Sequence, residues 1–140
     1  MTLSHLRTAI LALGCGAAVL GSVQAVHAAK IAAEQAVNGT AQVTLYLHSF
    51  LTAEELATLR VVSSNPQALE LFVKSNKGYA ALAAAPEEGV FRNGKPVASA
   101  IALTDLPDRA TAQANALKAC EAAKTTASAC VVILDVVPQN

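Results

Sequence analysis

The chain has 140 residues, of which 54% are hydrophobic, with ten Lys and Arg against ten Asp and Glu. This length predicts one domain. A formal net charge of zero without a basic patch argues against nucleic acid and anionic lipid surfaces as partners.

The first 28 residues have the pattern of a secretory signal peptide. Arg7 is the one charged side chain before a nearly unbroken run of apolar and small residues from Thr8 to Val23. Small residues around Val26-His27-Ala28 predict cleavage after Ala28, and Ala25 is the second choice. An uncleaved anchor is the alternative, because the apolar run is just long enough to span a bilayer.

Cys15 offers another alternative, since Leu13-Gly14-Cys15 is similar to a lipoprotein processing site. Ala12 stands where leucine is preferred, however, and an apolar stretch follows where a polar tether is usual. We therefore expect Cys15 to leave with the leader. Membrane attachment would need an uncleaved leader or a lipidated Cys15.

Cleavage after Ala28 leaves 112 residues (140 minus 28), and the loss of Arg7 leaves nine basic against ten acidic residues. Two cysteines remain, an even number in an exported chain. That combination fits an oxidising compartment, so we expect a periplasmic or secreted protein.

The processed chain begins with an alanine-rich segment, Lys30 to Thr40, which we interpret as a short helix or a loose arm. Residues 29–41 are therefore predicted as an N-terminal arm, and residues 42–138 as the single domain. Gln42 to His48 alternates apolar and polar residues, which predicts a half-buried strand.

Two helices are expected next. Thr52 and Glu55 form a capping box that opens the first, with Leu59 directed inward. Asn65 and Pro66 then provide a cap and a first helical residue for the second.

The second half of the chain predicts two strands and a helix. Tyr79 to Ala85 reads as a strand, and Asn93-Gly94 is a strong hairpin signal before a second strand at Pro96 to Leu103. Asp108 caps a last helix that runs to about Ala123.

The predicted order is β-α-α-β-β-α-β. It indicates a small two-layer α+β domain, with an antiparallel sheet of three or four strands, helices on one face, and one disulfide.

Two cysteines flank the turn between the last helix and an apolar final strand. Helical spacing places Cys120 on the face of Ala116 and Leu117, and Cys130 begins a β-branched run. Cysteines ten apart across such a turn can reach disulfide distance. A loop of about eleven residues closed in this way would stabilise the fold by roughly 3 kcal/mol. The alternatives are a redox-active pair, which lacks C-x-x-C spacing, and a metal site, which lacks histidines.

The pattern Ala112-x3-Ala116-Leu117-x2-Cys120, followed by Cys130-Val131-Val132, resembles a family of small exported bacterial domains of unknown function. A strand of the kind seen at Lys77 to Pro86 precedes this pattern in the family. The resemblance covers about residues 78–138 and implies a β-β-α-β unit with a disulfide between the two cysteines. It departs where the family often has glycine and tryptophan, since the second strand reads PVASAIAL here. Related domains occur attached to caspase-like proteins, which implies an accessory role and no reaction.

Few residues suggest catalysis. His48 is the only histidine after the predicted leader, with Ser49, Glu54 and Glu55 nearby. Adjacent strand residues point to opposite faces and no G-x-S-x-G elbow exists, so we interpret His48 as a solvent-facing polar residue. One histidine also argues against zinc.

Two acidic pairs allow weaker hypotheses. Asp105 and Asp108, with Thr104, offer oxygen ligands for calcium, but a helix-capping loop explains them better. Glu87 and Glu88 are interpreted as solvated turn residues.

These observations favour a non-catalytic periplasmic or secreted binding module without a cofactor, whose partner is an envelope protein contacted through the helices from Leu51 to Val73. The alternatives are a small exported hydrolase centred on His48, a small-molecule carrier and a lipoprotein.

Overall fold

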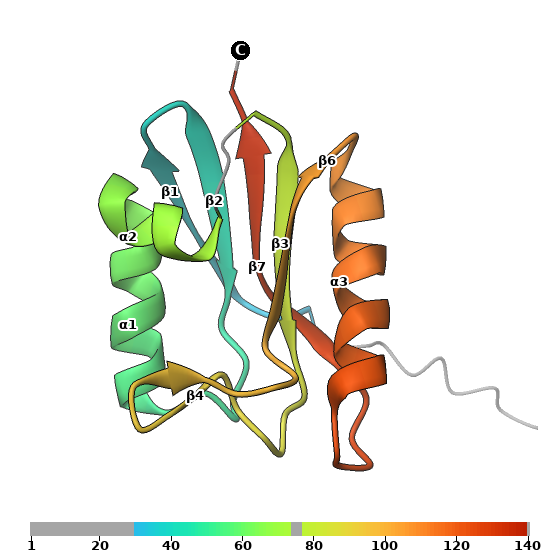
Figure 1. The fold of residues 1–140 in the computed structure, drawn as a ribbon. Helices are drawn as coiled ribbons and strands as arrows, with labels where there is room; N and C mark the ends of the chain where they lie inside the picture. Colours follow the sequence, from blue (N-terminus) through green and yellow to red (C-terminus); the bar gives the residue numbers. More distant parts are fainter. Residues whose placement is uncertain (1–29, 74–76, 140) are drawn as a thin grey trace, which may run out of the picture.

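The protein is built around one antiparallel sheet. The computed structural model describes residues 30–73 and 77–139, so the predicted leader and Cys15 lie outside the described residues. In chain order the elements are β1 (Ala33–Asn38), β2 (Ala41–Tyr46), α1 (Ala53–Ser64), α2 (Pro66–Phe72), β3 (Tyr79–Ala84), β4 (Phe91–Arg92), β5 (Lys95–Pro96), β6 (Ile101–Leu106), α3 (Arg109–Ala123) and β7 (Val131–Pro138). The five-stranded sheet has the order β1-β2-β7-β3-β6, and β4 and β5 form a separate ribbon (Figure 1). The predicted α+β class, antiparallel sheet and disulfide are confirmed.

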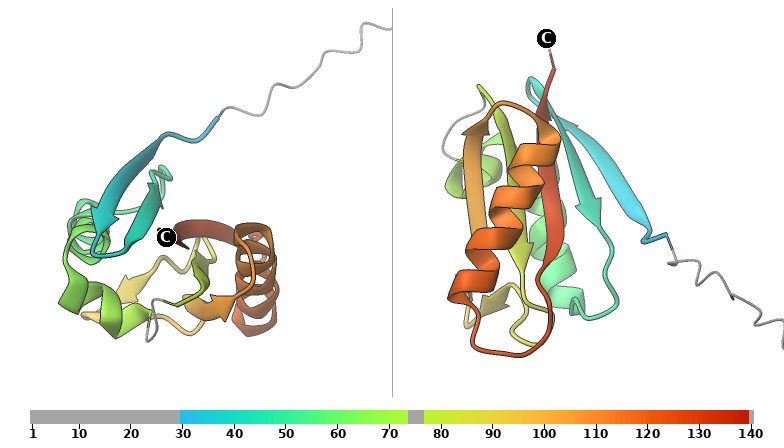
Figure 2. Two further views of the ribbon diagram at one scale, coloured as in Figure 1. Left: turned by 90° about the horizontal axis from the view of Figure 1, so that it is seen from above. Right: turned by 90° about the vertical axis from the view of Figure 1, so that its right-hand side faces the viewer.

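Helices cover both faces of this sheet, whereas we expected them on one face only. In β3, Leu82 packs in a core with residues of α1 and α2, and the adjacent Ala83 packs in a second core with Ala116 and Cys120 of α3. The two helical groups accordingly lie on opposite sides of the strands (Figure 2, left). A strand covered on both faces is apolar throughout, which explains the unbroken run YAALAA in β3. The domain therefore has three layers in place of the predicted two.

The segment Lys30 to Thr40 is neither a helix nor a loose arm, because it contributes β1 to the sheet. Every residue of β1 pairs with β2, and the two-residue loop between them begins with Gly39 at φ 62°. Glycine at that loop position is typical of hairpins. Asn38 also donates to the carbonyl oxygens of Val62 (3.1 Å) and Ser63 (3.2 Å) in α1. This strand raises the sheet to five strands from the three or four expected.

The predicted helix starts are confirmed. The Thr52 hydroxyl accepts from the Glu55 amide (3.1 Å), and the Glu55 carboxylate accepts from the Thr52 amide (2.9 Å). Asn65 caps α2 through the amide of Ala68 (3.0 Å), and Asp108 caps α3. These caps satisfy amides that have no partner within the helix.

The strand predicted at Pro96 to Leu103, after the Asn93-Gly94 hairpin, is not continuous in the structure. Asn93 and Gly94 have φ of 52° and 71° and close a hairpin in which Lys95–Pro96 pairs with Phe91–Arg92. The chain then turns, with the Ala100 amide donating to the Val97 carbonyl (3.0 Å), before β6 begins at Ile101. The predicted strand at Pro96 to Leu103 is thus divided between a ribbon and a sheet strand.

Candidate functional site

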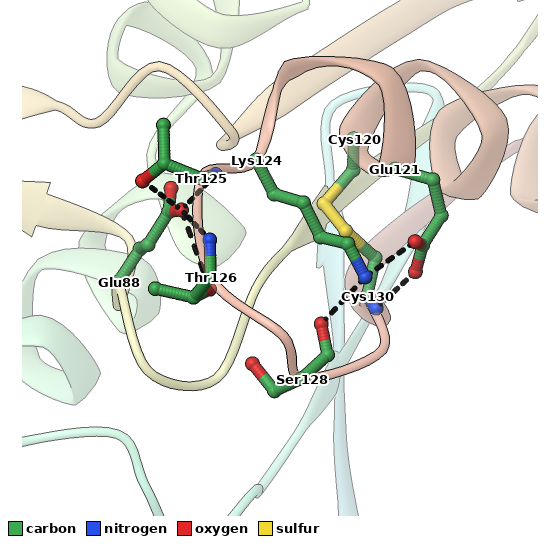
Figure 3. The surroundings of a disulfide bond; sticks show 8 residues. All are labelled: Glu88, Cys120, Glu121, Lys124, Thr125, Thr126, Ser128 and Cys130. Atoms are coloured by element: carbon green, nitrogen blue, oxygen red, sulfur yellow. Dashed lines mark hydrogen bonds and ion pairs between the residues drawn. A yellow bond between two sulfur atoms is a disulfide. The ribbon is translucent and has the colours of Figure 1, made fainter.

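A disulfide joins Cys120 at the end of α3 to Cys130 before β7, with 6.1 Å between the two Cα atoms. Side-chain bonds hold the intervening turn (Figure 3). Glu121 accepts from the Cys130 amide (2.6 Å) and pairs with Lys124, whose ammonium group donates to the Ser128 carbonyl (2.8 Å). The turn is therefore fixed by polar contacts as well as by the covalent bond.

Glu88, in the loop between β3 and β4, also holds this turn in place. Its Oε1 accepts from the amides of Thr125 (2.6 Å) and Thr126 (3.1 Å) and from both hydroxyls (Figure 3). The nearby Ser99 hydroxyl and these threonine groups lower the pKa of Glu88 to about 2. Our interpretation of Glu88 as a merely solvated turn residue is therefore wrong.

The sequence analysis missed a buried charged network on the α3 side of the sheet. Asp135 lies in β7 with a fully buried side chain, and its Oδ2 accepts from the Tyr46 hydroxyl (2.8 Å), Gln113 (2.7 Å) and Arg109 Nε (3.0 Å). Arg109 Nη2 also donates to the Thr44 hydroxyl (3.3 Å). The network joins β2, β7 and α3, and its bonds to Oδ2 compensate part of the cost of burying this carboxylate, whose Oδ1 has no hydrogen-bond partner among the described residues. The sequence signal for this network was Asp135, the one charged residue in the apolar run VVILDVVP.

The network alters the ionisation of its members. Burial and the neighbouring Asp135 carboxylate raise the pKa of Tyr46. Burial alone would lower the pKa of Arg109, but its bonds to Asp135 outweigh this effect and raise it. Both groups are thereby held in their protonated forms, so Tyr46 is a donor to Asp135 and a poor nucleophile.

An open depression of about 350 Å³ lies between α3 and the exposed part of the sheet, next to the disulfide. Apolar side chains form most of its wall, and polar groups stand among them. The lining residues are Ile31, Tyr46, His48, Gln113, Leu117, Cys130, Val131 and Val132. Binding sites are usually concave and largely apolar with a few polar groups, and the depression shares this composition although it is shallow.

His48 is half-buried in this depression, not facing solvent as we expected. Its Nε2 lies 2.7 Å from the Val132 carbonyl oxygen, and its ring lies 5.4 Å from that of Phe50. Ser49, Glu54 and Glu55 are not among the residues that line the depression. The structure therefore does not bring His48 together with these residues as a hydrolase centred on His48 would require.

Glu55 has a structural position instead. It is buried, and its Oε1 accepts from the amides of Val90 (2.8 Å) and Phe91 (3.2 Å). Burial raises the pKa of Glu55, but these bonds and that from Thr52 outweigh it, so the net pKa is lowered. Gly89 has a left-handed φ of 74°, which favours glycine, and a Cβ at this position would lie 2.7 Å from Glu55 Oε1. A second, more polar hollow of about 350 Å³ beside Glu55 is lined by groups that include this saturated carboxylate.

The remaining acidic candidates are Asp108, which has a local partner, and Asp105, which has an unusual backbone conformation. Asp108 accepts from the amide (2.7 Å) and the hydroxyl (2.8 Å) of Thr111, as a helix cap should. Asp105 has φ of 60°, which is uncommon for a residue other than glycine. Within residues 30–73 and 77–139, no three His, Cys, Asp or Glu side chains gather as a metal site would require.

Over the same described ranges, none of the helices combines the length and the apolar character needed to span a bilayer. Comparisons of the chain with protein-family models, with curated proteins and with solved structures give no match.

Proposed function

We propose that the protein is an exported, non-catalytic binding module that acts in the periplasm or outside the cell. The leader-like first 28 residues motivate export, and the Cys120–Cys130 disulfide is compatible with an oxidising compartment. The partner we propose is an envelope protein that places an apolar side chain in the depression beside the disulfide. This contact takes the place of the one we expected through the helices from Leu51 to Val73, where Val61 and Leu71 are exposed but line no part of the depression.

One observation supports binding over catalysis most strongly. The polar groups of the depression are engaged inside the protein: His48 with the Val132 carbonyl, and Tyr46 and Gln113 with Asp135. Its lining has no serine or threonine hydroxyl and no carboxylate, and the sulfur of Cys130 is in the disulfide. A bound group would meet apolar surface and polar side chains that already have partners inside the protein, so it would be held and not transformed.

A small-molecule carrier is the second candidate, and the volume of the depression is compatible with it. About 350 Å³ lies within the range of small-ligand sites. The same surface serves both candidates, so one set of variants tests them together.

The test is site-specific photo-crosslinking in the cells that make the protein. A benzophenone amino acid replaces Ile31, which lines the depression and is 46% exposed, or Val61 of α1, a control that is 54% exposed. We expect an adduct with an envelope protein from position 31 only. Ile31→Glu should then weaken binding of that purified partner at least tenfold, and Val61→Glu should not.

A different result identifies the alternatives. A small molecule that co-purifies and is lost in Ile31→Glu would favour the carrier. Equal adducts from both positions, or none from position 31, would contradict the proposed contact. Undiminished biological activity of His48→Ala would remove the hydrolase hypothesis.

A further inference from the structure

Strand β1 is one edge of the sheet, and its outer backbone groups lie beside no other strand of the described residues. The right-hand view of Figure 2 shows β1 at the margin of the fold, away from α3. Edge strands expose unpaired amides and carbonyls that can bind another strand.

The register identifies the outward groups. The Ala32 carbonyl accepts from the Leu47 amide (2.8 Å), so residue 32 directs its backbone toward β2. Backbone direction alternates along an antiparallel ladder. The amides and carbonyls of Ala33, Gln35 and Val37 therefore point away from the sheet.

The two edges of the sheet differ in how well they could extend. In β6, Asp105 takes a left-handed φ of 60°, the pairing with β3 shifts register between Tyr79 and Ala81, and Pro107 follows the strand. Such irregularities protect an edge from further pairing. β1 pairs with β2 without a register shift and contains neither lysine nor proline, and its Val37 is 70% exposed. Several of the usual protective features are thus present at β6, whereas β1 has only the charge of Glu34, which is paired with Arg60.

We propose that β1 is a self-association edge, where β1 of a second copy of this chain adds in antiparallel orientation about a two-fold axis at Gln35. In this register Gln35 faces its own counterpart, and Ala33 faces Val37 of the other copy. These are the residues with outward backbone groups, so each pair can exchange two hydrogen bonds.

The chemistry of β1 suits a second copy. Its one charged residue, Glu34, would lie opposite Ala36 of the other copy, so no like charges would meet across the strands. Glu34 is also paired with Arg60 of its own chain (2.7 Å). A formal net charge of zero, or of −1 after the predicted cleavage (nine basic minus ten acidic residues), adds little repulsion between two copies. Because one strand forms the contact, we expect a dimer that dissociates on dilution.

The first test is mass by light scattering, with protein produced from the full 140-residue chain and followed up to about 1 mM, the weak end of specific association. We expect the mass to approach twice that of the monomer with rising concentration. Gln35→Pro removes an outward amide that forms no hydrogen bond with β2, and Val37→Lys adds a charge to the edge strand. Both variants should therefore stay monomeric. Val61→Lys, an exposed apolar position on α1, should dimerise like the parent.

Cross-linking tests the register. In a Cys15→Ser background, Gln35→Cys should form an intermolecular disulfide under mild oxidation, because facing Cα atoms in such a pair lie about 5.5 Å apart. Val61→Cys should form none. A parent protein that is monomeric throughout, or dimers that survive both Gln35→Pro and Val37→Lys, would overturn the proposal. Loss of the dimer in Val61→Lys would also overturn it, since the contact would then lie on the helix. The outcome does not depend on whether the depression binds a partner.

Discussion

Reduction of the disulfide should lower the stability of the domain by an amount that the loop length sets. Cys120 and Cys130 are ten positions apart, so the bond closes a loop of about eleven residues (10 + 1). Chain entropy then gives a stabilisation of about 3 kcal/mol. The total for a domain of this size is about 5–15 kcal/mol, so this is a substantial share.

Reduction should lower the stability by changing the unfolded chain more than the folded one. In the folded state Glu88, Glu121 and Lys124 hold the turn independently, so the two sulfurs keep their neighbours after reduction. The unfolded chain, once released, expands and exposes more surface. We therefore expect a lower urea midpoint and a steeper dependence on urea.

Equilibrium urea unfolding with and without a phosphine reductant measures both quantities. A loss of about 3 kcal/mol corresponds to a midpoint about 1–3 M lower at ordinary urea sensitivities. The variant Cys120→Ala/Cys130→Ala should not respond to the reductant. Coincident midpoints for the oxidised and reduced protein would refute the reasoning, because the loop would then be equally constrained without the bond.

Three further predictions concern polar anchors. Glu55→Ala should lower the free energy of unfolding by about 2 kcal/mol in thermal or urea unfolding, because it leaves buried amides without an acceptor, whereas Glu54→Ala in the same turn should change it little. The pKa of Glu88 is about 2 when folded against an ordinary value of 4.5, so its contribution is complete above pH 4.5 and is lost as the pH falls toward 2. Glu88→Gln should accordingly flatten the acid dependence of the urea midpoint, and an unchanged pH profile would contradict this role. Arg109→Met should destabilise the protein by about 1–3 kcal/mol, and a double-mutant cycle with Asp135→Asn should show coupling; strictly additive effects would exclude the network.

The features that the sequence predicted well are those with local causes. Thr52 and Glu55 complete a capping box within four residues, and Asn93-Gly94 supplies the positive φ values that a tight hairpin requires. The cysteine pair was also predictable, because a separation of ten positions across a turn limits how far apart the two cysteines can lie. None of these needs knowledge of the distant chain.

The features that sequence analysis missed depend on tertiary contacts. β1 reads AEQAVN, a composition of low strand propensity, and it becomes a strand through pairing with β2 and packing by α1. The Asn38-Gly39 dipeptide carried the same hairpin signal as Asn93-Gly94, but the alanine-rich flank obscured it. Asp135 stood out as the one charge in VVILDVVP, although its partners on β2 and α3 come from distant parts of the chain.

The intact mass of the protein recovered from fractionated cells tests the central claim most directly, since it reports export and the disulfide together. We predict a periplasmic or secreted species that begins after Ala28 and is lighter by two hydrogen atoms than the reduced form of the same chain. A cytoplasmic, full-length chain with two free thiols at Cys120 and Cys130 would contradict the account.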